Sequence, residues 1–223
     1  RMNHVVRPLE GRVALVAGAT RGAGRGIART LAEAGAFVYC TGRSVAGRPS
    51  SLGRPETIDE TAALIRAAGG DATAVAVDHL DVGQVEALVG QIDRERGRLH
   101  ILVNDIWGGD GRTEWGKRAW ELDLERGLAL LHTAIDTHIV TARLALPLLL
   151  RAPAGLLVEV TDGDDLRYRD NLFYDLAKTQ VMRLAFALAQ ELRGTKVTAL
   201  AVTPGFMRSE AVLDHFGVSE ATW

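Results

Sequence analysis

The 223-residue sequence contains one cysteine, no long basic run and few aromatic side chains. The single thiol, Cys40, excludes an internal disulfide, and its apolar surroundings predict a buried, unreactive side chain. A formal net charge of −2 gives little support to a nucleic-acid-binding surface or a polybasic membrane anchor. Small molecules are therefore the expected partners.

No uncharged apolar run reaches the roughly 20 residues that a membrane span requires, and no signal peptide is visible. We therefore expect no membrane or nucleic-acid partner and a cytoplasmic location. Hydrophobic residues make up 47% of the chain, enough for one sizeable core at this length. The expected organisation is a single dinucleotide-binding domain over residues 1–223, with the substrate site on its C-terminal loops.

A glycine-rich turn follows the first apolar stretch of the chain. Gly18, Gly22 and Gly24 remove side chains where a strand turns sharply into a helix, so that a pyrophosphate can approach backbone N–H groups. The helix that follows, from about Arg25, directs its positive end toward the same anion. A flexible turn is the alternative explanation of the glycines, but the apolar residues on both sides favour a nucleotide site.

The end of the second predicted strand, residues 36–40, indicates which cofactor fits. Sites for the unphosphorylated dinucleotide usually carry an acid there, to bind the ribose 2′-hydroxyl. This chain has Arg43 instead, and we expect Arg43 and Arg21 to lie on either side of a 2′-phosphate. The sequence therefore favours NADP(H), with Thr20 assigned to the same site. The alternative is that both arginines are simply solvated.

Strands and helices alternate through the rest of the chain, which predicts an α/β fold: a Rossmann-like, doubly wound parallel sheet with helices on both faces. Further strands are expected at 72–77, 99–103, 155–161 and 195–202, and further helices at 56–68, 82–96, 117–150, 171–192 and 209–216. Asp78 closes the third strand, where it is placed to bind the adenine amino group. Asp81 and Gln84 resemble a capping box and are assigned to stability.

The helical segment 117–150 is more apolar than one sheet face requires. Its apolar stripe consists of Leu124, Leu128, Leu131, Ile135 and Ile139. A buried helix explains this stripe, and so does a surface shared with a second subunit in a homodimer or homotetramer. Trp107, in the glycine-rich segment before this helix, is a candidate for the wall of a ligand pocket.

Tyr174 and Lys178 are four residues apart on the last long helix, which places both side chains on one helical face. An ammonium group beside the phenol would lower a tyrosine pKa that starts near 10, as suits a general acid or base. An ordinary surface pair is the alternative interpretation of this spacing.

Together these residues resemble the short-chain dehydrogenase/reductase family, over nearly the whole chain and in the right order. The matching positions are Gly18, Gly22, Gly24, Asp78, Asn104, Tyr174, Lys178, Pro204 and Gly205. The resemblance implies that Tyr174 exchanges a proton with the substrate oxygen and that Lys178 binds the nicotinamide ribose. Thr161, thirteen residues before the tyrosine, stands where the family has a serine that binds the reacting oxygen.

The resemblance also assigns Asn104, Pro204, Gly205 and Ser209 to the cofactor site, with the hydroxyl of Ser209 in the place of a family threonine. Asp105 departs from the family pattern, because Asn-Asp-Ile-Trp-Gly replaces Asn-Asn-Ala-Gly.

A second departure lies in the long helix. Ala134 stands where many members have an asparagine that positions a water in the proton path, so this relay is absent unless His132 or Asp136 substitutes. The family sheet normally has a seventh strand after the substrate loop. We therefore expect the given chain to be incomplete, and the connection 162–171 is short for a substrate loop.

The predicted function is an NADP(H)-dependent oxidoreductase that transfers a hydride to or from a carbonyl or secondary alcohol. A catalytically weak or inactive NADP(H)-binding regulator or scaffold of the same fold is the alternative. A metal site at Asp162, Asp164 and Asp165 is a third hypothesis, although turn chemistry explains these acids and no metal is expected. Asp162, next to Thr161, adds a negative charge near the reacting oxygen that has no assigned purpose, and a loop acid that points to solvent is the alternative interpretation.

Overall fold

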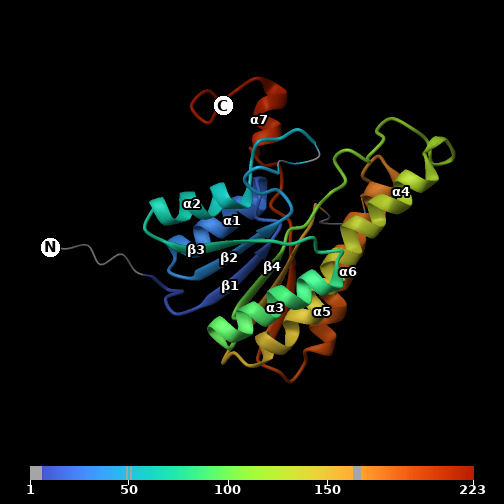
Figure 1. Ribbon diagram of the computed structural model, residues 1–223. Helices are drawn as coiled ribbons and strands as arrows, with labels where there is room; N and C mark the ends of the chain where they lie inside the picture. Colours follow the sequence, from blue (N-terminus) through green and yellow to red (C-terminus); the bar gives the residue numbers. More distant parts are fainter. Residues whose placement is uncertain (1–6, 49, 51, 163–166) are drawn as a thin grey trace.

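The computed structural model describes residues 7–48, 50, 52–162 and 167–223 (Figure 1). Within this part of the chain, six parallel strands form one sheet in the order β3-β2-β1-β4-β5-β6. The strands are β1 (Val13–Ala17), β2 (Phe37–Gly42), β3 (Asp71–Ala76), β4 (Ile101–Asn104), β5 (Gly155–Val160) and β6 (Val197–Val202). The order reverses between β1 and β4, and doubly wound sheets bind ligands at the carboxyl ends of the strands at such a point.

Helices cover both faces of the sheet, as the sequence predicts (Figure 1). One face packs against α1 (Gly22–Glu33) and α2 (Ile58–Ala67), and the other against α3 (Val82–Arg96), α5 (Thr137–Leu150) and α6 (Leu172–Glu191). The shorter helices are α4 (Leu124–Leu131) and α7 (Glu210–Phe216). The Rossmann-like α/β fold is confirmed.

The central strand β1 shows why the sheet requires apolar residues at every position. Leu15 packs into the core on the α3 and α5 side, while Ala14 and Val16 pack on the α1 and α2 side. A strand buried on both faces loses the alternation of apolar and polar residues. Each fully buried Leu or Val of this kind contributes roughly 1.5–3 kcal/mol to folding.

Cys40 lies on β2 and is buried, as predicted, and burial raises the pKa of its thiol to about 12. The strand itself ends two residues later than expected, because Thr41 pairs with Ala17 of β1 and Gly42 pairs with Ala76 of β3. Pairing with β3 therefore outweighs the low strand propensity of glycine at this position.

The predicted N-cap of α3 is confirmed, since the Asp81 carboxylate accepts a hydrogen bond from the Gln84 amide at 3.1 Å. The reciprocal half of the capping box is different. The side-chain oxygen of Gln84 accepts from the backbone N–H of Asp78 at 2.9 Å, which ties the end of the β3 loop to the helix.

The segment 117–150 is interrupted, whereas the sequence predicts a mostly continuous helix. A short 3₁₀ turn at 119–121 precedes α4, and a π-helical turn at 132–136 separates α4 from α5. Each π turn adds a residue and rotates the faces that follow. The predicted stripe does not form a buried face, because Leu124 and Leu128 are already exposed on α4 before the π turn and Ile139 is exposed after it. A buried helix therefore does not explain the stripe.

The same stretch, Leu124–Leu150, is long and apolar enough to match a membrane-spanning helix by length and composition. Half of its most apolar window is buried inside the structure. Core helices of globular domains often share these properties, so the match is weak evidence for a membrane span.

Strand β6 lies at one end of the sheet and is covered on one face. Val197 and Ala199 pack toward α6, while Leu200 and Val202 are exposed. Among the described residues no strand pairs with the outer edge of β6.

Candidate functional site

The turn between β1 and α1 requires glycine at two positions for steric reasons. Gly18 has a φ of +92°, and a Cβ atom there would lie 2.3 Å from the carbonyl oxygen of Asp105. A Cβ atom on Gly24 would lie 2.2 Å from the Gly18 carbonyl oxygen. The turn is thus packed tightly against the end of β4.

The first turn of α1 already binds an anionic group, the chain's own Glu210. The Glu210 carboxylate accepts a hydrogen bond from the backbone N–H of Gly22 at 2.7 Å. Helix N-termini bind anions through their free N–H groups and the helix dipole. The pyrophosphate of a dinucleotide carries oxygens of the same kind, so the turn fits that group.

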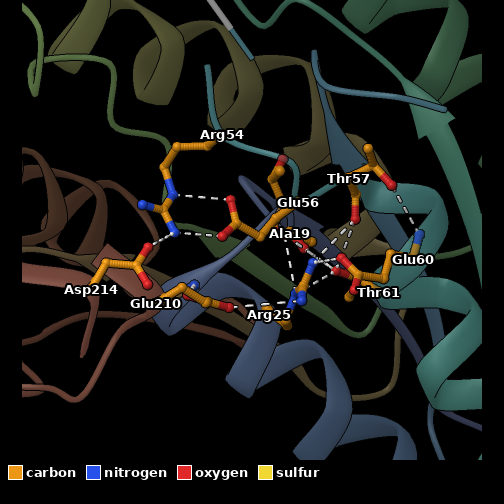
Figure 2. A network of polar contacts seen from close by, with 11 residues as sticks. Ala19, Arg25, Arg54, Glu56, Thr57, Glu60, Thr61, Glu210 and Asp214 are labelled. Atoms are coloured by element: carbon orange, nitrogen blue, oxygen red, sulfur yellow. Dashed lines mark hydrogen bonds and ion pairs between the residues drawn. The ribbon is translucent and has the colours of Figure 1, made fainter. Parts of the chain in front are cut away.

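Two arginines connect α7 to the cofactor end of the sheet (Figure 2). Arg25 contacts Glu60 of α2 at 2.6 Å and Glu210 at 3.7 Å. Arg54 contacts Glu56 at 2.5 Å and Asp214 of α7 at 3.0 Å. Helix α7, 188 residues from Gly22 in the chain, is therefore held over the glycine turn.

The arginine-bearing tip of β2 lies beside the same turn. A Cβ atom on Gly42 would lie 2.7 Å from the Thr20 hydroxyl, so the strand tip and the turn are in contact. Arg43 follows this contact and is exposed, and Arg21 is the N-cap residue of α1. The structure thus brings Thr20, Arg21 and Arg43 to one edge of the sheet.

Asp78, the predicted adenine ligand, is partly exposed at the carboxyl end of the sheet. Its carboxylate accepts a hydrogen bond from the Leu80 amide at 3.1 Å. This contact shapes its own loop and leaves the second carboxylate oxygen for other partners.

Asn104 directs its side chain into the core, and its assignment to the cofactor site stays a prediction. It is fully buried, and its amide nitrogen donates to Glu159 at 2.9 Å and to the His138 carbonyl oxygen at 3.3 Å. Its side-chain oxygen is buried without a partner among the described residues. Asn104 therefore positions β4 and β5 from within the core.

Glu159 and His138 form a buried ion pair beneath the site that sequence reasoning missed. The carboxylate lies 2.5 Å from the imidazole, whose other nitrogen lies 2.9 Å from the Ile106 carbonyl oxygen. Burial alone would lower the pKa of His138, but the hydrogen bond and charge of Glu159 outweigh it and raise the pKa. The signal in the sequence was a glutamate inside an otherwise apolar strand.

Asp105 packs against the glycine turn and replaces a neutral residue of the family pattern. Burial raises the pKa of its carboxyl to about 7, against the opposing charges of Lys178 and His138 and the amide of Gly24. A carboxyl in this position changes its charge near neutral pH.

Tyr174 contacts Asp162 instead of Thr161. Its hydroxyl donates a hydrogen bond to the Asp162 carboxylate at 2.5 Å, so Asp162 does not simply point to solvent. Burial and this carboxylate raise the pKa of Tyr174, whereas the sequence predicts a lowered pKa. Burial is the larger cause, and the carboxylate of Asp162, rather than the ammonium of Lys178, meets the phenol oxygen.

The ammonium of Lys178 lies over the ring of Trp107, 3.7 Å from the ring centroid. It is 5.4 Å from the centroid of the Tyr174 ring, and burial lowers its pKa. The rings of Trp107 and Trp115 contact Tyr174 at centroid distances of 5.4 and 5.0 Å. Trp107 thus borders the candidate catalytic pair, and its role as a pocket wall stays a prediction.

Thr161 is buried, and its hydroxyl donates to the backbone carbonyl of Lys178 at 2.8 Å. Ala134 packs with Leu130 and Ala177 in a small apolar cluster. His132 and Asp136 pair with each other, and their side chains are 61% and 46% exposed. They lie on the outer side of the helix and do not replace the family asparagine.

The segment after β6 borders an open cleft of about 390 Å³. Its lining includes Asp162, Gly205, Phe206 and Ser209. Ser209 caps α7, accepting from Val212 N at 3.4 Å, and its Cβ approaches Gly22. Gly205 has a φ of +71°, which favours glycine, and the adjoining Pro204 is exposed.

The described residues do not test the metal hypothesis. Asp164 and Asp165 lie outside the described residues, and within the described ranges no group of three or more metal-ligating side chains is present.

Fold and site define the class of protein. A parallel sheet whose strand order reverses beside a glycine turn, with helices on both faces, is a Rossmann-like α/β fold of the kind that binds ligands at this edge. The short chain dehydrogenase family model matches residues 12–215. The chain belongs to this family of nicotinamide-dependent oxidoreductases.

Related proteins and solved structures of the same family are similar to this chain over most of its length. Dehydrogenase/reductase SDR family member 1 of Homo sapiens is 31% identical over 216 residues, which is 96% of this chain and 66% of the human protein. A short-chain dehydrogenase/reductase structure from Burkholderia xenovorans is 28% identical, covers 94% of this chain and 79% of its own, and has a TM-score of 0.80. A metagenomic short-chain oxidoreductase in complex with NADP is 27% identical, with coverages of 89% and 84% and a TM-score of 0.75. The chain spans about two thirds of the length of the human relative.

Proposed function

We propose that this protein is an NADP(H)-dependent oxidoreductase that interconverts a carbonyl compound and a secondary alcohol. The observation that carries the proposal is the meeting of Tyr174, Lys178 and Trp107 at the carboxyl ends of β4 and β5, across from the glycine turn. This arrangement joins a proton donor, a cation and an apolar wall where a nicotinamide would lie.

The preference for the phosphorylated dinucleotide rests on the tip of β2. Arg43 and Arg21 lie at one edge of the sheet, and the residues at the tip are Thr41 and Gly42, with no carboxylate among them. A guanidinium group binds a phosphate in bidentate fashion, whereas a carboxylate there would repel it. The NADP complex of a related metagenomic enzyme supports this choice.

The cofactor and the site residues have separate roles in carbonyl reduction. The reduced nicotinamide supplies the hydride when the dinucleotide is bound. Tyr174 is held in its protonated form by burial and by Asp162, so it serves as the acid that protonates the substrate oxygen. Lys178 places a positive charge beside the developing oxyanion, and Trp107 and Trp115 restrict water at the phenol.

A panel of aldehydes, ketones and quinones, assayed by NADPH oxidation, tests this proposal. The Tyr174→Phe variant is expected to lose at least about 100-fold in kcat, because it lacks the acidic proton. Tyr168→Phe is the matched control, since Tyr168 is an exposed tyrosine that is not among the residues lining the cleft. Equal activity of wild type and Tyr174→Phe would contradict the assigned proton donor.

A cofactor-binding regulator without turnover is the second candidate. Ala134 lacks the polar group of the family relay, and Thr161 donates its hydroxyl proton to a backbone carbonyl. NADPH binding without oxidation of any panel member, in wild type and variant alike, would favour this candidate.

We also propose a homodimer or homotetramer that covers the exposed apolar side chains of α4 and α5. Leu124, Leu128 and Ile139 are 66%, 53% and 45% exposed, which is costly on a surface facing water. Light scattering on wild type and a Leu124→Lys, Leu128→Lys variant tests it, and a monomeric wild type would contradict it.

A further inference from the structure

Asp162 follows β5 directly and has access to two environments. Its carboxylate accepts the hydrogen bond of Tyr174 at 2.5 Å, and the residue also lines the open cleft beside Phe206 and Ser209. A carboxylate in this position can take a proton from the phenol and release it to water in the cleft.

The other polar groups assigned to proton handling in the family are engaged elsewhere or absent. The Thr161 hydroxyl donates to the Lys178 carbonyl, and Ala134 has no polar side chain. His132 and Asp136 face outward. Among the described residues, Asp162 is the hydrogen-bond partner of the Tyr174 oxygen.

We infer, building on the proposed function, that Asp162 is the proton partner of Tyr174. Asp162 accepts the phenol proton when an alcohol is oxidised and returns it when a carbonyl is reduced. A phenol that carries its proton cannot simply accept a second one, so it can act as a base only while it releases the first. The short hydrogen bond to Asp162 provides the place for that proton.

In alcohol oxidation the substrate O–H bond breaks as its proton forms a new bond to the Tyr174 oxygen. At the same time the original phenol O–H bond breaks, and the proton joins the Asp162 carboxylate to give a carboxylic acid. The alcohol carbon loses a hydride to the oxidised dinucleotide, which balances the electrons. Asp162 then releases the proton to water. Carbonyl reduction reverses each step.

Several charged groups surround the phenol and contribute to its titration. Arg169 lowers the pKa of Tyr174, while Asp162 and Asp110 raise it together with burial. Lys178 is on the same helix, with its ammonium on the Trp107 ring. Asp162 differs from all of these in contacting the phenol oxygen.

The first test requires no turnover. Phenolate absorbance is titrated in the wild type and in Asp162→Asn, each with Tyr174→Phe subtracted to isolate one tyrosine. We expect the Tyr174 titration to move to lower pH in Asp162→Asn by about one unit or more, because a neutral amide replaces the carboxylate. Asp110→Asn, which removes a nearby charge without touching the phenol oxygen, should move it less. An unchanged titration in Asp162→Asn would overturn the inference.

The second test measures turnover. Asp162→Asn is expected to reduce kcat for alcohol oxidation about 100-fold, with the Kd for the dinucleotide within twofold of wild type. Added acetate should raise the kcat of Asp162→Ala at least tenfold by entering the space that the side chain leaves. A purely structural role of Asp162 would not give this recovery. Equal kcat in wild type and Asp162→Asn would overturn the proton role alone. A wild type without turnover on any substrate would overturn the proposed function as well.

Discussion

Glu210→Gln is expected to tighten the binding of the dinucleotide. In the structure the Glu210 carboxylate accepts the Gly22 N–H at 2.7 Å, at the end of α1 where a pyrophosphate would approach. The dinucleotide must therefore displace this carboxylate or accept a second negative charge beside its phosphates. Glu210→Gln removes the negative charge, which lowers both the free energy needed to displace the side chain and the repulsion of the phosphates.

The magnitude follows from the contact. A hydrogen bond to a charged group contributes roughly 1.5–3 kcal/mol, and a neutral one about 1 kcal/mol. The Glu210 side chain is 30% exposed and lies 3.7 Å from Arg25, so solvent and this counter-charge reduce the difference. A net gain of about 1 kcal/mol in the binding free energy of the dinucleotide remains, which corresponds to a roughly fivefold lower Kd.

The assay is a calorimetric titration of NADPH into wild type, Glu210→Gln and Asp214→Asn, each at low and high salt. Asp214→Asn removes the same charge from α7 by breaking the contact with Arg54, and it leaves the Gly22 contact in place. Affinity equal to or weaker than wild type in Glu210→Gln would refute the competition. Equal tightening by Asp214→Asn would show that release of α7, rather than the carboxylate, controls binding.

The remaining predictions concern stability. Gly24→Ala should abolish dinucleotide binding and cost about 3 kcal/mol or prevent folding, because its Cβ would lie 2.2 Å from a backbone carbonyl oxygen. Gly26→Ala is the control: it has open space in the same helix and should gain up to about 1 kcal/mol in urea unfolding. His79, buried between two threonine hydroxyls, has its pKa lowered from 6.5 to about 4 by burial. The unfolded chain therefore binds this proton more readily, so stability is complete above about pH 6.5 and falls toward pH 4, with about 2 kcal/mol lost at pH 5. In His79→Asn this part of the slope of unfolding free energy against pH should vanish, and an equal slope in both proteins would contradict the assignment.

The fold was predictable because its signals are local. Each of the six strands is a short apolar run between turn residues, and the strand–helix alternation restricts the topology to a parallel sheet. Strand ends differed by one or two residues where pairing with neighbours decides, as at Gly42. The break in the long helix was not predictable, because a π turn leaves the apolar composition unchanged.

The candidate site was predictable only in part. Tyr174, Lys178 and Trp107 converge as their spacing and strand positions indicate. The contact of Asp162 with Tyr174 and the contact of Glu210 with Gly22 were not predicted. The first depends on side-chain direction, and the second joins residues 188 positions apart in the chain. The spacing of residues along the chain predicts neither the direction of a side chain nor a contact between distant segments.

The outer edge of β6 is where this sheet can be extended. Among the described residues no strand pairs with that edge, and Leu200 and Val202 beside it are exposed. The backbone N–H and C=O groups along such an edge accept a further strand. A seventh strand of the kind normal in the family would add there, and so would a strand from a second copy of this part of the chain.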